Sequence, residues 1–154
     1  MEFLNNQRFD TIELETYNDW LYVKLNRPKS KNALSNAMIT ELINLISLAA
    51  SQQFLRGIFL SGKEGSFCSG ADLKAFMGVS EEFESTIPST TKQVLMGEIF
   101  QEVHKPIICQ LHANIMAGGL FFLTGSHFVI ADQKVTLGLP EVKRGLFPFQ
   151  VLAA

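Results

Sequence analysis

The sequence predicts one α/β domain in which buried strands alternate with helices through crossover connections. Short apolar runs such as "GIFLSG" and "PIICQL" have the length and composition of buried strands. Longer segments with apolar residues at helical spacing separate them, which is the pattern of parallel sheets. With 154 residues, 47% of them apolar, the chain has enough material for one core and too little for two. We therefore expect residues 1–154 to form a single domain.

The first elements are a hairpin and a helix. Residues Thr11–Glu15 and Trp20–Asn26 alternate apolar and polar side chains around the turn signal "TYND", which predicts an antiparallel hairpin. A polar loop, Arg27–Asn32, follows. Ser35 is suited to capping a helix that runs to about Gln52. The helical spacing is carried by Met38, Leu42, Leu45, Ile46 and Ala49.

The middle of the chain repeats the alternation of strand and helix. Gly57–Gly62 is expected to be a buried strand, and "ADLKAF" a short helical turn. A longer helix is expected from about Ser89 to His104, ending before Pro106 because proline disfavours helix at the residue before it. Pro106–Leu111 then forms another buried strand.

The last part of the chain predicts a helix, two strands and a final helical turn. Ala117–Ser126 opens with two glycines and is expected to be a buried helix. Short strands are expected over His127–Asp132 and Lys134–Gly138, and "LPEV" begins a last turn of helix. We find no internal sequence repeat and no low-complexity tract.

Composition and charge exclude several classes of partner. The formal net charge is −2 and no long basic run occurs, so neither nucleic acid nor an anionic membrane surface is an expected partner. No apolar run approaches the roughly 18 residues of a membrane helix. Cys68 and Cys109 lack the spacing of a metal site, and a core of this size does not need a disulfide. A cytoplasmic location is therefore expected.

Small residues follow two of the predicted strands, just before helical turns. They occur in "GIFLS…CSGADLK" and again in "PIICQLHANIMAGGLFF". The first N–H groups of a helix have no partner within it, and small side chains allow another atom to approach them. Two such N–H groups directed at one point would form an oxyanion hole. Tight packing between strand and helix explains the glycines equally well, and spacing alone does not decide between the two.

Four stretches occur in the order and approximate separations typical of a known family. They are "LNRPKSKNALSNAMITEL", "GSFCSGADLK", "AGGLFFL" and "LGLPEVKRGLFP". From about residue 10 to residue 148, the chain resembles the crotonase (enoyl-CoA hydratase/isomerase) superfamily. The resemblance implies a spiral of β-β-α units that binds coenzyme A thioesters. In that family, later helices finish the acyl pocket and build trimers or hexamers. We expect this chain to lack that C-terminal helical region, and the full-length protein to be a homo-oligomer.

The resemblance also assigns site residues. The N–H groups of Ala71 and Gly118 would hold the thioester oxygen while an enolate forms, and Glu141 would transfer the proton. The groove for coenzyme A and its acyl group would be lined by Lys29, Lys31, Ala33, Ala71, Asp72, Leu73, Lys74, Gly118 and Phe121. Solvated charges on a polar loop explain Lys29 and Lys31 equally well. Coenzyme A would be part of the substrate, with no separate cofactor and no metal.

The chain departs from the hydratase pattern at Phe121. Many hydratases of the family carry a second glutamate there, which helps to hold the attacking water; phenylalanine cannot do this. The substitution favours chemistry with one carboxylate, such as double-bond isomerisation. The alternative is a non-catalytic or incomplete relative that binds acyl-CoA or another subunit. Taken without the resemblance, Glu141 is simply a first-turn residue that complements the helix dipole.

Other polar residues are assigned structural roles. Asp72 is expected to cap a helix rather than act as a base. Ser66 and Ser69 are expected to stabilise loops, because no base lies at a known spacing from either. Nothing near Cys68 marks it as a reactive thiolate.

Overall fold

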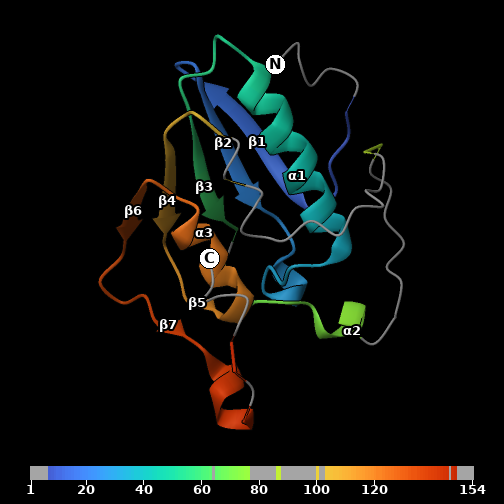
Figure 1. Ribbon diagram of the computed structural model, residues 1–154, viewed down its shortest axis with the longest axis vertical. Coiled ribbons are helices and arrows are strands. Elements are labelled where there is room, and N and C mark those ends of the chain that lie inside the picture. The colour runs from blue at the N-terminus through green and yellow to red at the C-terminus, as the bar shows by residue number, and fades with distance from the viewer. Residues whose placement is uncertain are drawn as a thin grey trace.

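A five-stranded sheet is the centre of the molecule (Figure 1). The computed structural model describes residues 7–63, 65–76, 86–87, 100, 103–145 and 147–148. The strands, in spatial order, are β1 (Ile12–Tyr17), β2 (Trp20–Leu25), β3 (Gly57–Gly62), β4 (Ile107–Leu111) and β6 (Phe128–Ala131). The β1–β2 pair is antiparallel and the other three pairs are parallel. The α/β class is therefore confirmed. The helix expected over 89–104 lies almost entirely outside the described residues, as does the C-terminal end.

The hairpin between β1 and β2 is tighter than the sequence indicated. Its turn consists of Asn18 and Asp19, both left-handed with φ of 48° and 62°. Two consecutive residues with positive φ form the turn that matches the twist of paired strands, and Asn and Asp tolerate that conformation best after glycine. Strand β1 consequently extends to Tyr17, so that Thr16 and Tyr17 belong to the ladder.

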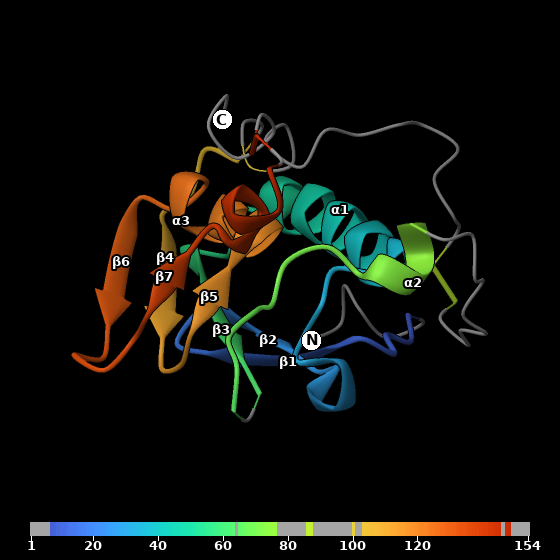
Figure 2. The same cartoon turned by 90° about the horizontal axis from the view of Figure 1, so that it is seen from below.

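Helix α1 (Asn36–Ser51) lies on one face of the main sheet, on the side of β1 and β2 (Figures 1 and 2). Its start is fixed as expected, because the Ser35 hydroxyl accepts the Met38 N–H at 3.3 Å. The side turned towards the sheet is buried along the whole helix. It comprises Ala37, Met38, Thr40, Glu41, Leu42, Leu45, Ile46 and Ala49.

A second, smaller set of paired segments follows the main sheet. Strand β5 (Ile115–Met116) pairs in parallel with β7 (Leu137–Gly138). Ile115 of β5 also forms an isolated bridge with Cys68. Ala71, on the same segment as Cys68, forms a second bridge with Leu34. Each parallel strand of the main sheet is thus followed by a segment of this second layer. The sequence did not indicate β5, and of the strand expected over 134–138 only β7 is present.

A helical segment follows each member of the second layer and completes a β-β-α unit. Helix α1 follows Leu34, and α2 (Leu73–Phe76) follows Ala71. The 3₁₀ helix η4 (Ala117–Leu120) and α3 (Phe121–Thr124) follow β5, and the 3₁₀ helix η5 (Pro140–Arg144) follows β7. The fold is thus a structural repeat that the sequence does not display, because the connections between its units differ in length.

The helix predicted over Ala117–Ser126 needs correction. It begins as a 3₁₀ helix and ends at Thr124. Gly118 and Gly119 are poor helix formers, and a methyl group at Gly119 would lie only 3.0 Å from the Cys68 side chain. Close packing against the preceding unit therefore determines the backbone here, more than helical propensity does.

The core lies between the main sheet and the helical face, where Phe67 and Phe122 are fully buried and meet edge to face at 5.6 Å. Strand β6 contrasts with this core: the exposed fractions of Phe128 and Ile130 are 64% and 57%. Parallel sheets are ordinarily covered on both faces, so β6 is unusually exposed.

A buried carboxylate joins α1 to the start of β1. Glu41 is 0% exposed and accepts hydrogen bonds from the Asp10 N–H at 2.7 Å, from the Thr11 N–H at 2.9 Å and from the Thr11 hydroxyl. Its three donors would be left without an acceptor if the carboxylate were removed.

We expect Glu41→Ala to lower the free energy of unfolding by at least about 2 kcal/mol, because buried donors left unpaired cost about 1–3 kcal/mol. Urea unfolding followed by circular dichroism measures the change. Glu15→Ala removes an exposed carboxylate from β1 and should shift stability by no more than about 0.5 kcal/mol. Equal effects of the two substitutions would contradict the role assigned to Glu41.

Candidate functional site

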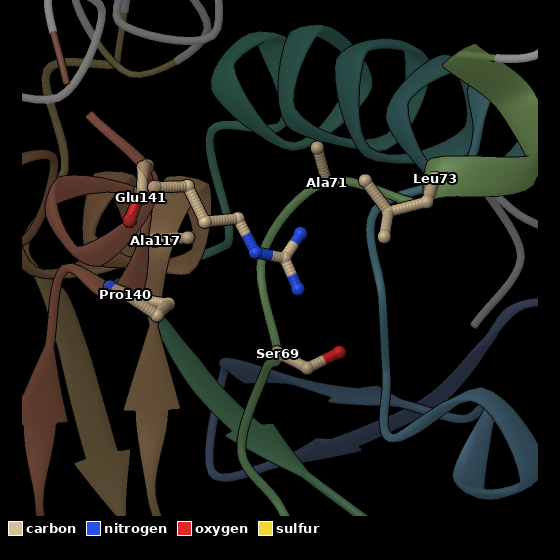
Figure 3. A pocket seen from close by; sticks show the side chains of 7 residues that line it. Ser69, Ala71, Leu73, Ala117, Pro140 and Glu141 are labelled. Atoms are coloured by element: carbon tan, nitrogen blue, oxygen red, sulfur yellow. The ribbon is translucent and has the colours of Figure 1, made fainter. Parts of the chain in front are cut away.

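A pocket of about 480 Å³ opens where three successive β-β-α units meet (Figure 3). One wall comes from the segment before α2, the second from the start of η4 and the third from η5. It is lined by Ser69, Ala71, Leu73, Ala117, Pro140, Glu141 and Arg144. The pocket therefore lies where the second layer gives way to helices, at the same point in each unit.

The segment 66–72 is hydrogen-bonded along both of its edges. On one edge, the Ser69 N–H donates to Lys31 at 3.1 Å, the Gly70 carbonyl accepts from Leu34 at 2.8 Å, and the Asp72 N–H donates to Leu34 at 3.0 Å. On the other edge, the Phe67 N–H donates to the Asn114 carbonyl at 3.0 Å, and the Cys68 carbonyl accepts from the Met116 N–H at 2.9 Å. This pattern turns the Ala71 N–H away from Leu34, towards the pocket.

The N–H groups of Ala71 and Gly118 come from different units and lie side by side. A methyl group built on Gly118 would be 3.7 Å from the Ala71 nitrogen, and one built on Gly70 would be 3.3 Å from the Gly118 nitrogen. Gly118 is the second residue of η4, so its N–H has no partner within that helix. Among the described residues, no hydrogen bond from the Ala71 N–H is found. Two donors therefore remain available at one place.

Left-handed backbone precedes each of these donors. Gly70 has φ of 95° and Ala117 has φ of 51°, and a methyl group at Gly70 would lie 2.6 Å from the Ala117 Cβ. Glycine at 70 is readily explained, but a left-handed alanine is strained by about 1–2 kcal/mol. Strain of this kind is often retained at functional sites. Sequence reasoning missed it, since alanine is not a residue that signals positive φ.

Glu141 faces the pocket from η5, across from Ala71 and beside Ala117 (Figure 3). Its Oε2 atom is buried and makes no hydrogen bond with any described residue. A buried carboxylate oxygen without a donor is costly and uncommon in folded proteins. This unpartnered oxygen makes Glu141 a candidate functional residue of the pocket.

Asp72 holds the pocket wall in place and does not line it. Its Oδ2 pairs with the Arg27 guanidinium at 3.0 Å, and both side chains are nearly buried. Its Oδ1 accepts the Lys74 N–H at 3.0 Å, which confirms the expected helix cap. Arg27 also donates to the Ala33 carbonyl at 2.6 Å. This buried pair fixes the loop before α1 against the residues that follow Ala71.

Asn32 secures the same loop from its other side. It is 0% exposed, its Oδ1 accepts the Arg27 N–H at 2.8 Å, and its Nδ2 donates to the carbonyls of Lys63 and Ser66 at 3.0 and 2.8 Å. The oxygen and the nitrogen of the Asn32 side-chain amide are thus both hydrogen-bonded to backbone groups, as a buried amide requires. Sequence reasoning treated the residue only as part of a polar loop.

Of the residues proposed for a ligand groove, only Ala71 and Leu73 line this pocket; Gly118 lies beside Ala71 but is not a lining residue, and the rest lie elsewhere. Lys29, Lys31 and Lys74 are exposed, whereas Ala33 is buried. The loop that carries the first two lysines touches the pocket indirectly, because Ser69 donates to Lys31 through its N–H and to Ser30 through its hydroxyl at 3.4 Å. Phe121 is 5% exposed, and it is not among the lining residues.

The structure adds lining residues that the sequence did not assign to the site: Ser69, Ala117, Pro140 and Arg144. Of these four residues, only Arg144 could have been suspected from the sequence, because it is a cation three residues after Glu141. Cys68 lies close to the pocket wall, but burial raises the pKa of its thiol to about 11, so the thiolate is disfavoured at neutral pH. This agrees with the expectation that Cys68 is not a nucleophile.

Comparison with known proteins identifies the family. The sequence profile described as "Enoyl-CoA hydratase/isomerase" matches residues 15–153. The chain belongs to the enoyl-CoA hydratase/isomerase family. It is 32% identical, over 128 residues, to a probable mitochondrial enoyl-CoA hydratase of Dictyostelium discoideum; the match covers 82% of this chain and 44% of that protein. A probable enoyl-CoA hydratase of Bacillus subtilis is also 32% identical, over 76% of this chain and 45% of the relative.

Solved structures of family members share the fold. Pseudomonas aeruginosa AtuE superimposes with a TM-score of 0.78 at 26% identity, over 94% of this chain and 56% of that one. An enoyl-CoA hydratase/isomerase of Marinobacter aquaeolei gives 0.78 at 28% identity, over 93% and 56%. The chain thus spans about half the length of the curated relatives it matches. Within its described residues, no helix is long and apolar enough to cross a membrane.

The contact between Gly70 and Ala117 gives a direct test of how this family member builds its site. We expect Gly70→Ala to lower the free energy of unfolding by about 2 kcal/mol or more, from left-handed strain and the clash with Ala117. Gly65→Ala is the matched control: Gly65 is also left-handed, at φ of 65°, but has open space around its Cα. That variant should lose only about 1 kcal/mol. The free energy of unfolding of both variants is measured by urea unfolding. An equal decrease in the two would show that the units are not tightly packed at Gly70.

Proposed function

We propose that the protein is an acyl-CoA-processing enzyme that stabilises a thioester enolate and moves one proton with Glu141. The observation that carries this proposal is that Ala71 and Glu141, whose Oε2 has no partner among the described residues, line one pocket, with the Gly118 backbone beside the Ala71 N–H. Family membership supports thioester chemistry, since the relatives are named as enoyl-CoA hydratases.

The two N–H groups act as the oxyanion hole. The thioester oxygen accepts a hydrogen bond from each, and these bonds strengthen as negative charge develops on that oxygen. Donors fixed in place by folding need no reorganisation during the reaction, and losing one costs about 2.7–4 kcal/mol of transition-state stabilisation. The strained turns at Gly70 and Ala117 are what keep the donors in place.

Glu141 acts as the base and then as the acid. Its carboxylate takes the proton from the α-carbon, the C–H electron pair becomes the enolate double bond, and the charge moves to the thioester oxygen. Returning the proton to the γ-carbon of a 3-enoyl thioester completes a double-bond isomerisation. Among the described lining residues, Glu141 is the only carboxylate. One-carboxylate isomerisation is therefore favoured over hydration, for which Phe121 offers no group to hold water.

Coenzyme A itself is proposed to lie along the loop that precedes α1. Lys29 and Lys31 are exposed there and would meet the phosphates, while Leu73 and Lys74 extend the same surface from α2. The hydrogen bonds from Ser69 to this loop place it beside the pocket. Assembly of the whole protein as a homo-oligomer belongs to this proposal too, as does its location in the cytoplasm.

We expect Glu141→Gln to reduce isomerisation of 3-hexenoyl-CoA at least about 100-fold, because general base catalysis contributes about 10² to 10⁴. The dissociation constant for acetoacetyl-CoA should stay within about threefold, since an amide of the same shape remains. Isomerisation is followed by conjugated-enoyl absorbance, and binding of acetoacetyl-CoA by isothermal titration calorimetry. Glu15→Gln is the control. Unchanged turnover in the Glu141 variant would refute the assignment, and absence of turnover in both proteins would favour a binding module.

Gly118→Ala tests the oxyanion hole without disturbing the fold. The added methyl group meets no atom closer than 3.7 Å, so stability should be unchanged within about 0.5 kcal/mol. It would, however, occupy space beside the Ala71 N–H where the thioester oxygen is proposed to bind. Affinity for acetoacetyl-CoA should fall at least about tenfold towards that for free coenzyme A. Retained affinity and enolate signal would place the oxygen elsewhere.

A further inference from the structure

The pocket contains a positive charge that the proposed reaction does not use. Among the described residues that line it, Arg144 is the only cation. Most of its lining neighbours, such as Leu73, Ala117 and Pro140, are apolar (Figure 3). An apolar pocket with a few charged groups usually owes its specificity to those groups.

The Arg144 guanidinium makes no ion pair or hydrogen bond with any described residue. Arg27 shows the contrast, because its guanidinium pairs with Asp72 and donates to Ala33. Although Glu141 is only three residues away, its Oε2 also remains without a partner among the described residues. The two charged groups of the pocket therefore do not pair with each other, and the exposed Arg144 side chain is left available to a ligand.

The spacing of Glu141 and Arg144 limits what the arginine can meet. Both lie on η5, and residues three apart in a 3₁₀ helix are eclipsed with a rise of about 6 Å. If Glu141 faces the α-carbon, Arg144 can therefore reach only a part of the bound molecule that is a few bonds from that carbon. The phosphates of coenzyme A are separated from the thioester by the long, uncharged pantetheine arm. An anion within a few bonds of the thioester must belong to the acyl group.

We propose that Arg144 selects acyl groups that end in a second carboxylate, so that the preferred ligands are coenzyme A thioesters of dicarboxylic acids. The planar guanidinium offers paired N–H donors that match the two oxygens of a carboxylate. This inference rests on the proposed function, since it uses the thioester position between Ala71, Gly118 and Glu141.

The test compares thioesters that differ only in the terminal group. Succinyl-, glutaryl- and adipyl-CoA are each paired with the monocarboxylic thioester of the same carbon number, and free coenzyme A is the reference. Dissociation constants are measured by isothermal titration calorimetry. We expect at least one dicarboxylic thioester to bind about tenfold or more tightly than its monocarboxylic partner, the range of a charge-assisted hydrogen bond.

Variants then assign that preference to a residue. Arg144→Gln should reduce the ratio within each pair to near one. Arg144→Lys keeps the positive charge but loses the planar pair of N–H donors, so it should retain only part of the preference. Lys143→Gln removes a neighbouring exposed cation that does not line the pocket, so it should leave the ratio unchanged. Circular dichroism of each variant confirms that the fold is intact.

The outcomes separate this inference from the proposed function. If thioesters bind more tightly than free coenzyme A but every pair shows a ratio near one, the role of Arg144 is overturned and the proposed function stands. That role is likewise overturned if Arg144→Gln keeps the wild-type ratio. If no thioester binds more tightly than free coenzyme A, both are overturned.

Discussion

The site depends on the backbone hydrogen bonds along both edges of residues 66–72. One edge is joined to the loop before α1 and the other to the residues around β5, so three β-β-α units share one ladder. A segment bonded on both edges cannot shift without breaking several bonds, each worth about 0.5–1.5 kcal/mol net. The Ala71 N–H is left over from this ladder, and for that reason it faces the pocket as a rigid donor.

Buried polar side chains hold the same region from outside the ladder. The Arg27–Asp72 pair and the Asn32 amide connect the loop before α1 to both ends of the segment. Removing one partner from a buried ion pair costs about 3–5 kcal/mol, so these residues couple stability to site geometry. Asp72 therefore belongs to the scaffold, while Glu141 and Arg144 line the pocket.

Stability and ligand binding place opposite demands on the pocket. A left-handed alanine at 117 and a buried, unpartnered oxygen on Glu141 both cost free energy in the absence of a ligand. The well-packed core around Phe67 and Phe122 compensates for such costs. Strand β6 also costs free energy, because its apolar side chains Phe128 and Ile130 remain exposed to solvent. The strands of parallel sheets are usually covered on both faces.

The sequence by itself determined the α/β class, the hairpin, α1 with its Ser35 cap, and strands β3 and β4, since periodicity and capping are local properties. Motif resemblance also pointed to Ala71, Gly118 and Glu141. Only the tertiary structure decided that the N–H groups of the first two lie together, that Ala117 is left-handed, and that Arg144 enters the pocket. The physical reason is that these features arise from contacts between units far apart in the chain, and no local pattern encodes such contacts.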